Sequence, residues 1–156
     1  IQQLNINIRM KKLTILMVAL FSALCLLSCQ KDNSKHGKSD AIETSYWKAE
    51  LNNGESFYVA IEEITAEDKE DAPIPINDKY TNVLMAEIDG DSFFGFAYKN
   101  GYKIEVAELG SVGRQFPTTY DYNGTMLSCQ YNSEYAAFIK ISEEQFYDSV
   151  MCFSKE

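Results

Sequence analysis

Few residues of this sequence have the chemistry needed for catalysis or metal binding. It contains 1 His, 4 Cys and 23 Asp and Glu residues among 156. The single histidine, His36, lies in the stretch 30–40, which has no apolar residue and which we expect to be a flexible tether unable to fix a catalytic geometry. The sequence has no Gly-rich phosphate loop and no CxxC pair. We therefore predict no catalytic residue, no metal site and no cofactor.

Carboxylates remain the one group that could support hydrolysis. Two facing Asp or Glu side chains can cleave a glycosidic bond, but 23 acids allow too many combinations to single out a pair. The acidic stretch 62–78 lacks the spacing of an EF-hand calcium loop. Pro73 and Pro75 exclude a central strand there, so we expect a solvated acidic loop or a short helix. We expect a protein that is not an enzyme, with a carboxylate-based hydrolase as the last alternative.

The segment before Cys29 indicates a chemical modification. Lys11 and Lys12 precede an apolar run over 13–27, which is the layout of a secretory signal and too short to span a membrane comfortably. The end of this run, Leu-Leu-Ser-Cys over 26–29, resembles the lipobox of bacterial lipoproteins. The resemblance implies cleavage after Ser28 and acylation of Cys29, palmitate included, with membrane lipid as the resulting partner. A plain secretory signal or an uncleaved anchor is the alternative.

The residues that flank this signal complete the domain organisation. Gln-Lys-Asp over 30–32 resembles the opening of export signals on surface lipoproteins of some Gram-negative bacteria. The resemblance implies an outer-membrane protein displayed at the cell surface, with the periplasmic face as the alternative. We expect residues 1–9 to precede the true start at Met10. The predicted organisation is therefore 1–28 (upstream residues plus signal peptide), 29–40 (tether) and 41–156 (one domain).

The charge of the chain narrows its possible partners. Without residues 1–28 it carries 11 basic and 23 acidic residues, a net charge of −12. A polyanion would be repelled by such a surface, which argues against nucleic-acid binding.

The pattern of turns predicts the fold of 41–156. Asn-Gly or Asp-Gly pairs begin at positions 53, 89, 100 and 123, and Asn-Ser-Glu at 132 is a weaker fifth turn signal. No stretch keeps an apolar face at helical spacing, so at most one short helix is expected, near 62–72 or 142–147. The prediction is an all-β antiparallel meander of about eight to nine strands that closes into a small barrel, with a sandwich as the alternative. The strands are expected near 45–51, 55–64, 80–88, 92–99, 102–109, 118–122, 125–131, 135–141 and 146–154.

Strand register follows from the requirement that apolar side chains share a face. A three-residue loop over 52–54 pairs Trp47 with Val59 and keeps both apolar sets on one face. Two-residue turns at 89–90 and 100–101 likewise gather one apolar set inside the middle meander. This set is Leu84, Ala86, Ile88, Phe93, Gly95, Ala97, Ile104 and Val106.

A second apolar face remains on the strand near 92–99. Phe94, Phe96 and Tyr98 point away from the set above and form an aromatic stripe on the outer surface. Either a loop or terminal segment packs on this stripe, or it binds a partner.

The domain also resembles small lipocalin-like lipoproteins. The resemblance depends on Trp47 in the first strand and on an aromatic last strand ending in Met-Cys-Phe over 151–153, although the lipocalin Gly-x-Trp signature is missing. It implies a barrel mouth that binds a small hydrophobic ligand, with Trp47, Phe93, Gly95 and Ala97 as candidate contacts; aromatic side chains filling the barrel are the alternative. The function expected first is thus a membrane-tethered binding module for a small hydrophobic ligand or a glycan. The second is an accessory lipoprotein that docks on an outer-membrane protein.

Two cysteines remain once Cys25 is removed and Cys29 is acylated. Cys129 and Cys152 are expected on strands separated by a third, about 9–10 Å apart, which is too far for a disulfide. We predict two free thiols.

Overall fold

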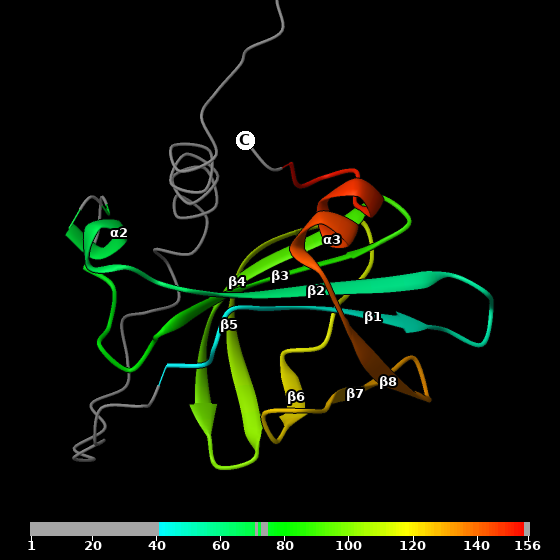
Figure 1. The fold of residues 1–156 in the computed structure, drawn as a ribbon, viewed down its shortest axis with the longest axis horizontal. Coiled ribbons are helices and arrows are strands. Elements are labelled where there is room, and N and C mark those ends of the chain that lie inside the picture. Colours follow the sequence, from blue (N-terminus) through cyan, green and yellow to red (C-terminus); the bar gives the residue numbers. More distant parts are fainter. Residues whose placement is uncertain (1–40, 71, 73–74, 155–156) are drawn as a thin grey trace, which may run out of the picture.

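The computed structural model describes residues 41–70, 72 and 75–154, and these form a closed antiparallel barrel in which β8 returns to pair with β1 (Figure 1). The predicted all-β barrel is confirmed, with eight strands. The strands are β1 (Ser45–Glu50), β2 (Ser56–Glu63), β3 (Asn82–Ile88), β4 (Asp91–Asn100), β5 (Lys103–Val112), β6 (Thr119–Tyr122), β7 (Leu127–Tyr131) and β8 (Glu134–Ile141). The short helices are α2 (Ala66–Glu70) and α3 (Glu143–Ser149). The predicted signal peptide, tether and acylated Cys29 lie outside the described residues.

The first hairpin has the predicted register. Trp47 pairs with Val59, and Leu51 and Glu55 close a three-residue loop in which Gly54 has a φ of 86°. Because this register puts Trp47 and Val59 on the same face, both side chains are fully buried inside the barrel.

Of the two turns of the middle meander, the first was predicted correctly and the second lies one residue later than predicted. Asp89 and Gly90 form the expected two-residue turn with positive φ at both positions, as a type I′ turn requires. The next turn uses Gly101 and Tyr102 instead of Asn100 and Gly101, because Asn100 pairs with Lys103. Only Gly101 has positive φ here, which fits a type II′ turn with glycine first. This shift changes the pairing of β4 with β5 by two positions. Because side chains alternate between the faces of a strand, an even shift leaves each side chain on its predicted face.

Residues 143–149 form helix α3, which replaces the predicted ninth strand at 146–154. The helix begins at a capping box: the Ser142 hydroxyl accepts from the Gln145 amide, and the Gln145 side chain accepts from the Ser142 amide. Phe146 is fully buried against the outside of the barrel. The two positions named for a single short helix, near 62–72 and 142–147, both carry one, so only the expectation of at most one helix was wrong. Helix α2 lies in the acidic segment where a loop or short helix was expected.

Two apolar layers hold the fold together, one inside the barrel and one outside it. The inner cluster contains the set predicted for the middle meander, except Gly95, together with residues from all the other strands. The outer cluster lies between α3 and the strands β1 to β4, and α3 covers this side in Figure 1. Its buried members are Tyr46, Ala60, Ile64, Met85, Phe94, Phe96, Phe146 and Val150.

Neither α2 nor α3 has the length or apolar character that crossing a membrane requires, and these are the helices of the described residues.

Candidate functional site

The four candidate ligand contacts face the barrel interior, which is packed with side chains. Trp47, Phe93 and Ala97 each expose at most 1% of their surface. The Phe57 ring alone lies 5.0 Å from the Phe138 ring and 5.4 Å from that of Tyr131, measured between centroids. The alternative in which aromatic side chains fill the barrel therefore agrees with the observed interior.

Gly95 does not leave the space for a ligand that its small size suggested. A Cβ atom at this position would lie 2.6 Å from both the Val106 side chain and the Ala107 carbonyl oxygen. The strand pairing shifts between Phe94 and Gly95, where β5 carries a bulge. Glycine is thus required because the bulged neighbour approaches its backbone closely.

Cys129 and Tyr120 lie in the apolar interior of the barrel and are unreactive at neutral pH. The Cys129 thiol is buried in the interior, and burial raises its pKa to about 12. The Tyr120 hydroxyl is fully buried nearby, has no hydrogen-bond partner in the described part of the chain, and has a pKa raised well above its ordinary value by burial. Both groups stay protonated at neutral pH, so neither is suited to act as a nucleophile.

One end of the barrel is closed by the segment that leads into β1. Ile42 is 2% exposed and belongs to the inner cluster. Its amide donates to Asn82 Oδ1 at 2.9 Å, and Asn82 Nδ2 donates to the Ile42 carbonyl at 2.7 Å. Both backbone groups are therefore satisfied although they are buried.

The opposite end is closed by Phe116, which belongs to the segment between β5 and β6. Its ring centroid lies 5.9 Å from that of Phe57 and 5.8 Å from that of Phe93. The ring contacts place Phe116 over the last inward-facing residues at this end.

Arg114 fastens the same segment to two hairpins. Its Nη1 and Nη2 atoms donate to the Glu55 carboxylate at 2.8 and 3.2 Å, and its Nε atom donates to Asp91 Oδ2 at 2.8 Å. These hydrogen bonds, first to Glu55 and then to Asp91, raise the pKa of Arg114, and Arg114 lowers the pKa of Glu55. Segment 113–118 is thus held across the barrel end by charge as well as by packing.

The aromatic stripe on β4 is a packing surface and not an exposed one. Phe94 and Phe96 are buried in the outer cluster together with Phe146 and Val150, so for these two rings a terminal segment packs on the stripe, as one of the two expectations had it. Tyr98 is half-buried, and its hydroxyl donates to Glu105. This hydrogen bond is the largest cause that raises the pKa of Tyr98 to about 12, followed by burial.

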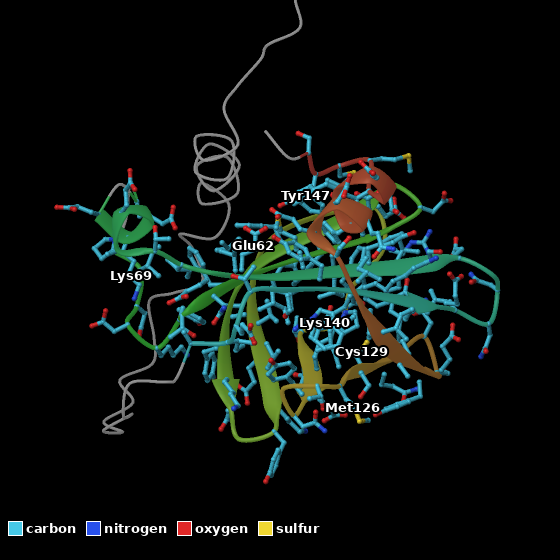
Figure 2. The ribbon with its side chains drawn as sticks, in the orientation of Figure 1. Glu62, Lys69, Met126, Cys129, Lys140 and Tyr147 are labelled. Atoms are coloured by element: carbon cyan, nitrogen blue, oxygen red, sulfur yellow. The ribbon has the colours of Figure 1, made fainter. Side chains whose placement is uncertain are left out.

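Hydrogen bonds to carboxylates hold α3 and the following segment over this stripe. Glu62 on β2 accepts from the hydroxyls of Tyr147 at 2.8 Å and Tyr46 at 3.3 Å, and Figure 2 shows Glu62 below Tyr147. Glu87 on β3 accepts from the amides of Met151 and Cys152, both at 2.7 Å. Burial is the largest cause that raises the pKa of Tyr147, followed by the charge of Glu62.

The outer face of β8 carries a second apolar surface, which stays open. Its outward-facing residues are Tyr135, Ala137 and Ile139, here called the β8 strip, and all three are exposed, Tyr135 by 63% and Ile139 by 67%. The inward-facing Ala136 and Phe138 are buried. An antiparallel strand with one face in the core normally has a polar outer face. The β8 strip is therefore the candidate functional site.

The surroundings of the β8 strip are polar. The Tyr135 hydroxyl lies 2.6 Å from Ser128 Oγ on β7, and Ile139 pairs with Lys48 on β1. An apolar centre with a polar rim is the usual anatomy of a protein–protein contact surface. Sequence reasoning missed this strip, although the run Tyr-Ala-Ala-Phe-Ile over 135–139 is apolar at both inward and outward positions and could have revealed it.

Comparisons with protein-family models, with curated proteins and with solved structures give no match to this chain. Within the described ranges, no group of three or more His, Cys, Asp or Glu side chains could hold a metal ion.

Proposed function

We propose that this protein is a lipid-anchored accessory lipoprotein that docks on a protein partner at the outer membrane through the β8 strip. The anchor is an acylated Cys29, and the barrel is the docking domain. The observation that carries the proposal is the contrast between a filled interior and an open apolar strip on the outside.

The proposed anchor is supported by the sequence alone. A basic pair, a short apolar run and a Ser-Cys junction at 28–29 are the features of a lipoprotein signal, and two or three acyl chains bind a membrane firmly. The expected location is the outer membrane at the cell surface. Replacing Cys29 by Ala should move the protein out of the membrane fraction and abolish labelling with a radioactive fatty acid; a variant that stays in the membrane fraction would contradict the anchor.

Packing favours an external partner over a small ligand in the barrel. Ligand entry would require displacement of Ile42 at one end or of Phe116 at the other, and both side chains are buried. Removing such groups from a core costs several kcal/mol, on the order of 2–5 for one large side chain. The β8 strip needs no such rearrangement, because its side chains already face solvent.

The partner is expected to be a protein with its own apolar patch. Tyr135 combines a large apolar ring with a polar hydroxyl, a side chain that is enriched where proteins contact each other. The half-buried Lys48 at the rim forms an ion pair with Glu50, which leaves little unbalanced charge to recruit a polyanionic partner.

Site-specific photocrosslinking in cells tests this proposal. A photoreactive amino acid in place of Ala137 should yield one discrete adduct, while the same group in place of Val112 on β5, which is also exposed and apolar, should yield none. Ile139→Asp should abolish the Ala137 adduct without shifting the thermal unfolding midpoint. Equal adducts at both positions would overturn the proposal, and an adduct of twice the chain mass would replace the separate partner by a second copy.

A further inference from the structure

One end of the barrel receives the chain from the proposed anchor. Residues 41–44 lead into β1, and because neighbouring strands are antiparallel, the β4–β5 turn and the β6–β7 loop lie at this same end. Figure 1 shows this turn and this loop side by side at the lower edge of the molecule. A hydrogen bond joins their strands there, from the Tyr122 amide to the Tyr102 carbonyl at 2.8 Å.

The proposed anchor would keep this end close to a membrane. Cys29 and Ala41 are separated by residues 30–40, and even a fully extended chain of this length spans only about 40 Å. This is close to the length of a ten-residue strand such as β4, roughly 33 Å. The end that carries residues 41–44 is therefore the one that meets the lipid surface most readily.

Two exposed apolar side chains lie at this end. Tyr102 in the β4–β5 turn is 81% exposed, and Met126 in the β6–β7 loop is 62% exposed. Figure 2 shows Met126 at the lower edge, on the opposite side of the molecule from Tyr147 of α3. Most of the surface of both side chains thus lies outside the packing of the described residues.

We infer that Tyr102 and Met126 rest on the lipid surface that holds Cys29. Tyrosine is enriched at membrane interfaces, because its ring sits among the headgroups while its hydroxyl stays in water. Lys103 follows Tyr102 in the chain, and a lysine side chain extends along apolar surface with its ammonium group near lipid phosphates. The inference depends on the proposed lipid anchor and adds an orientation of the barrel to it.

Charge restricts the contact to one side of this end. The β2–β3 connection also lies here, and its helix α2 carries Glu67, Asp68 and Glu70 with Lys69 as the one basic residue of the helix. Anionic headgroups repel such a segment. The barrel should therefore tilt toward its β4–β7 side, with α2 held away from the lipid.

Fluorescence quenching by brominated lipids tests the orientation. The lipidated full chain is reconstituted in vesicles of phosphatidylcholine and phosphatidylglycerol with brominated acyl chains, and Tyr102→Trp is compared with Val112→Trp. Val112 is similarly exposed, 66%, but lies near the opposite end of β5. The buried Trp47 supplies the same background emission in both variants.

The expected result is loss of the added emission in Tyr102→Trp and full retention in Val112→Trp. Met126→Trp should lose its added emission as well, which gives a second reading if the turn does not tolerate tryptophan. Protein that floats with the vesicles but shows no quenching at 102 or 126 would overturn the orientation and leave the anchor intact. Protein that fails to float would overturn the anchor and the orientation together.

Discussion

Ile42 and Asn82 exchange two hydrogen bonds across 40 positions of the chain. The Asn82 Oδ1 atom also accepts from the Thr81 hydroxyl at 2.8 Å, so the oxygen and the nitrogen of this fully buried side chain both have hydrogen-bond partners. This amide replaces the missing strand partner of the segment before β1 and fixes it over the barrel end.

Replacement of Asn82 by Ala should therefore destabilise the protein by about 2–3 kcal/mol, because it leaves the buried amide and carbonyl of Ile42 without partners. Urea unfolding measures the loss, and hydrogen exchange should show faster exchange of the Ile42 amide. Asn100→Ala is the matched control: within the described residues this exposed side-chain amide donates one hydrogen bond, to Glu105, and its removal should change stability by less than about 1 kcal/mol. Equal losses in the two variants would contradict the role of Asn82.

The pair of Arg114 and Glu55 should make stability depend on pH. Arg114 lowers the pKa of Glu55 in the folded protein, so the stabilisation is present above the ordinary Glu pKa of about 4.3 and is lost as the pH falls through the lowered folded-state value. Arg114→Gln should unfold at lower urea than the wild type at neutral pH, and this difference should shrink toward zero below that value. A difference that stays constant across the acid range would show that Arg114 acts through packing and not through charge.

Trp47→Ala should cost about 3–5 kcal/mol, the usual range for removing a large aromatic side chain from a core. Trp47 is fully buried, its ring meets that of Tyr122 edge-on at 6.4 Å, and its Nε1 atom donates to Ser45 Oγ at 2.9 Å. Thermal or urea unfolding gives the cost, with Tyr102→Ala as a control that should stay within about 0.5 kcal/mol. In the wild type, acrylamide should quench the Trp47 fluorescence poorly; free quenching would mean that the interior is open to solvent.

The two cysteines of the barrel domain should react at very different rates. Both are free, as predicted, but for a different reason: Cys129 points into the interior, whereas Cys152 lies outside the barrel after α3. Cys152 is exposed and should be alkylated in the native protein, slowed by a raised pKa of which burial is the largest cause. Cys129 should react only after unfolding. Mass spectrometry of the digested protein assigns each thiol, and native labelling of Cys129 would contradict the packed interior.

The sequence by itself determined the barrel and most of its register. Strand alternation has a period of two, so a wrong register would have moved a whole apolar set into solvent, and the pairing of Trp47 with Val59 could be predicted for that reason. The turn at Asp89 and Gly90 was predicted correctly, because a turn with two positive φ angles strongly favours an Asp-Gly pair. The Gly101 turn was misplaced by one residue, since glycine also fits the first position of a different turn type.

Tertiary structure decided which apolar surfaces are covered. Segment 146–154 has a composition typical of a strand, yet its first part is helical. The capping box at Ser142 begins the helix, and the helix is stable because it buries Phe146 on the barrel, a site that an isolated segment does not have. Arg114 meets Glu55 from 59 positions away, a contact that local sequence does not encode. Strands β4 and β8 are both apolar on two faces, so their sequences look alike. Helix α3 covers the outer face of β4 and leaves the β8 strip exposed. Which of the two is buried depends on where a distant segment folds back, and this is a property of the whole chain.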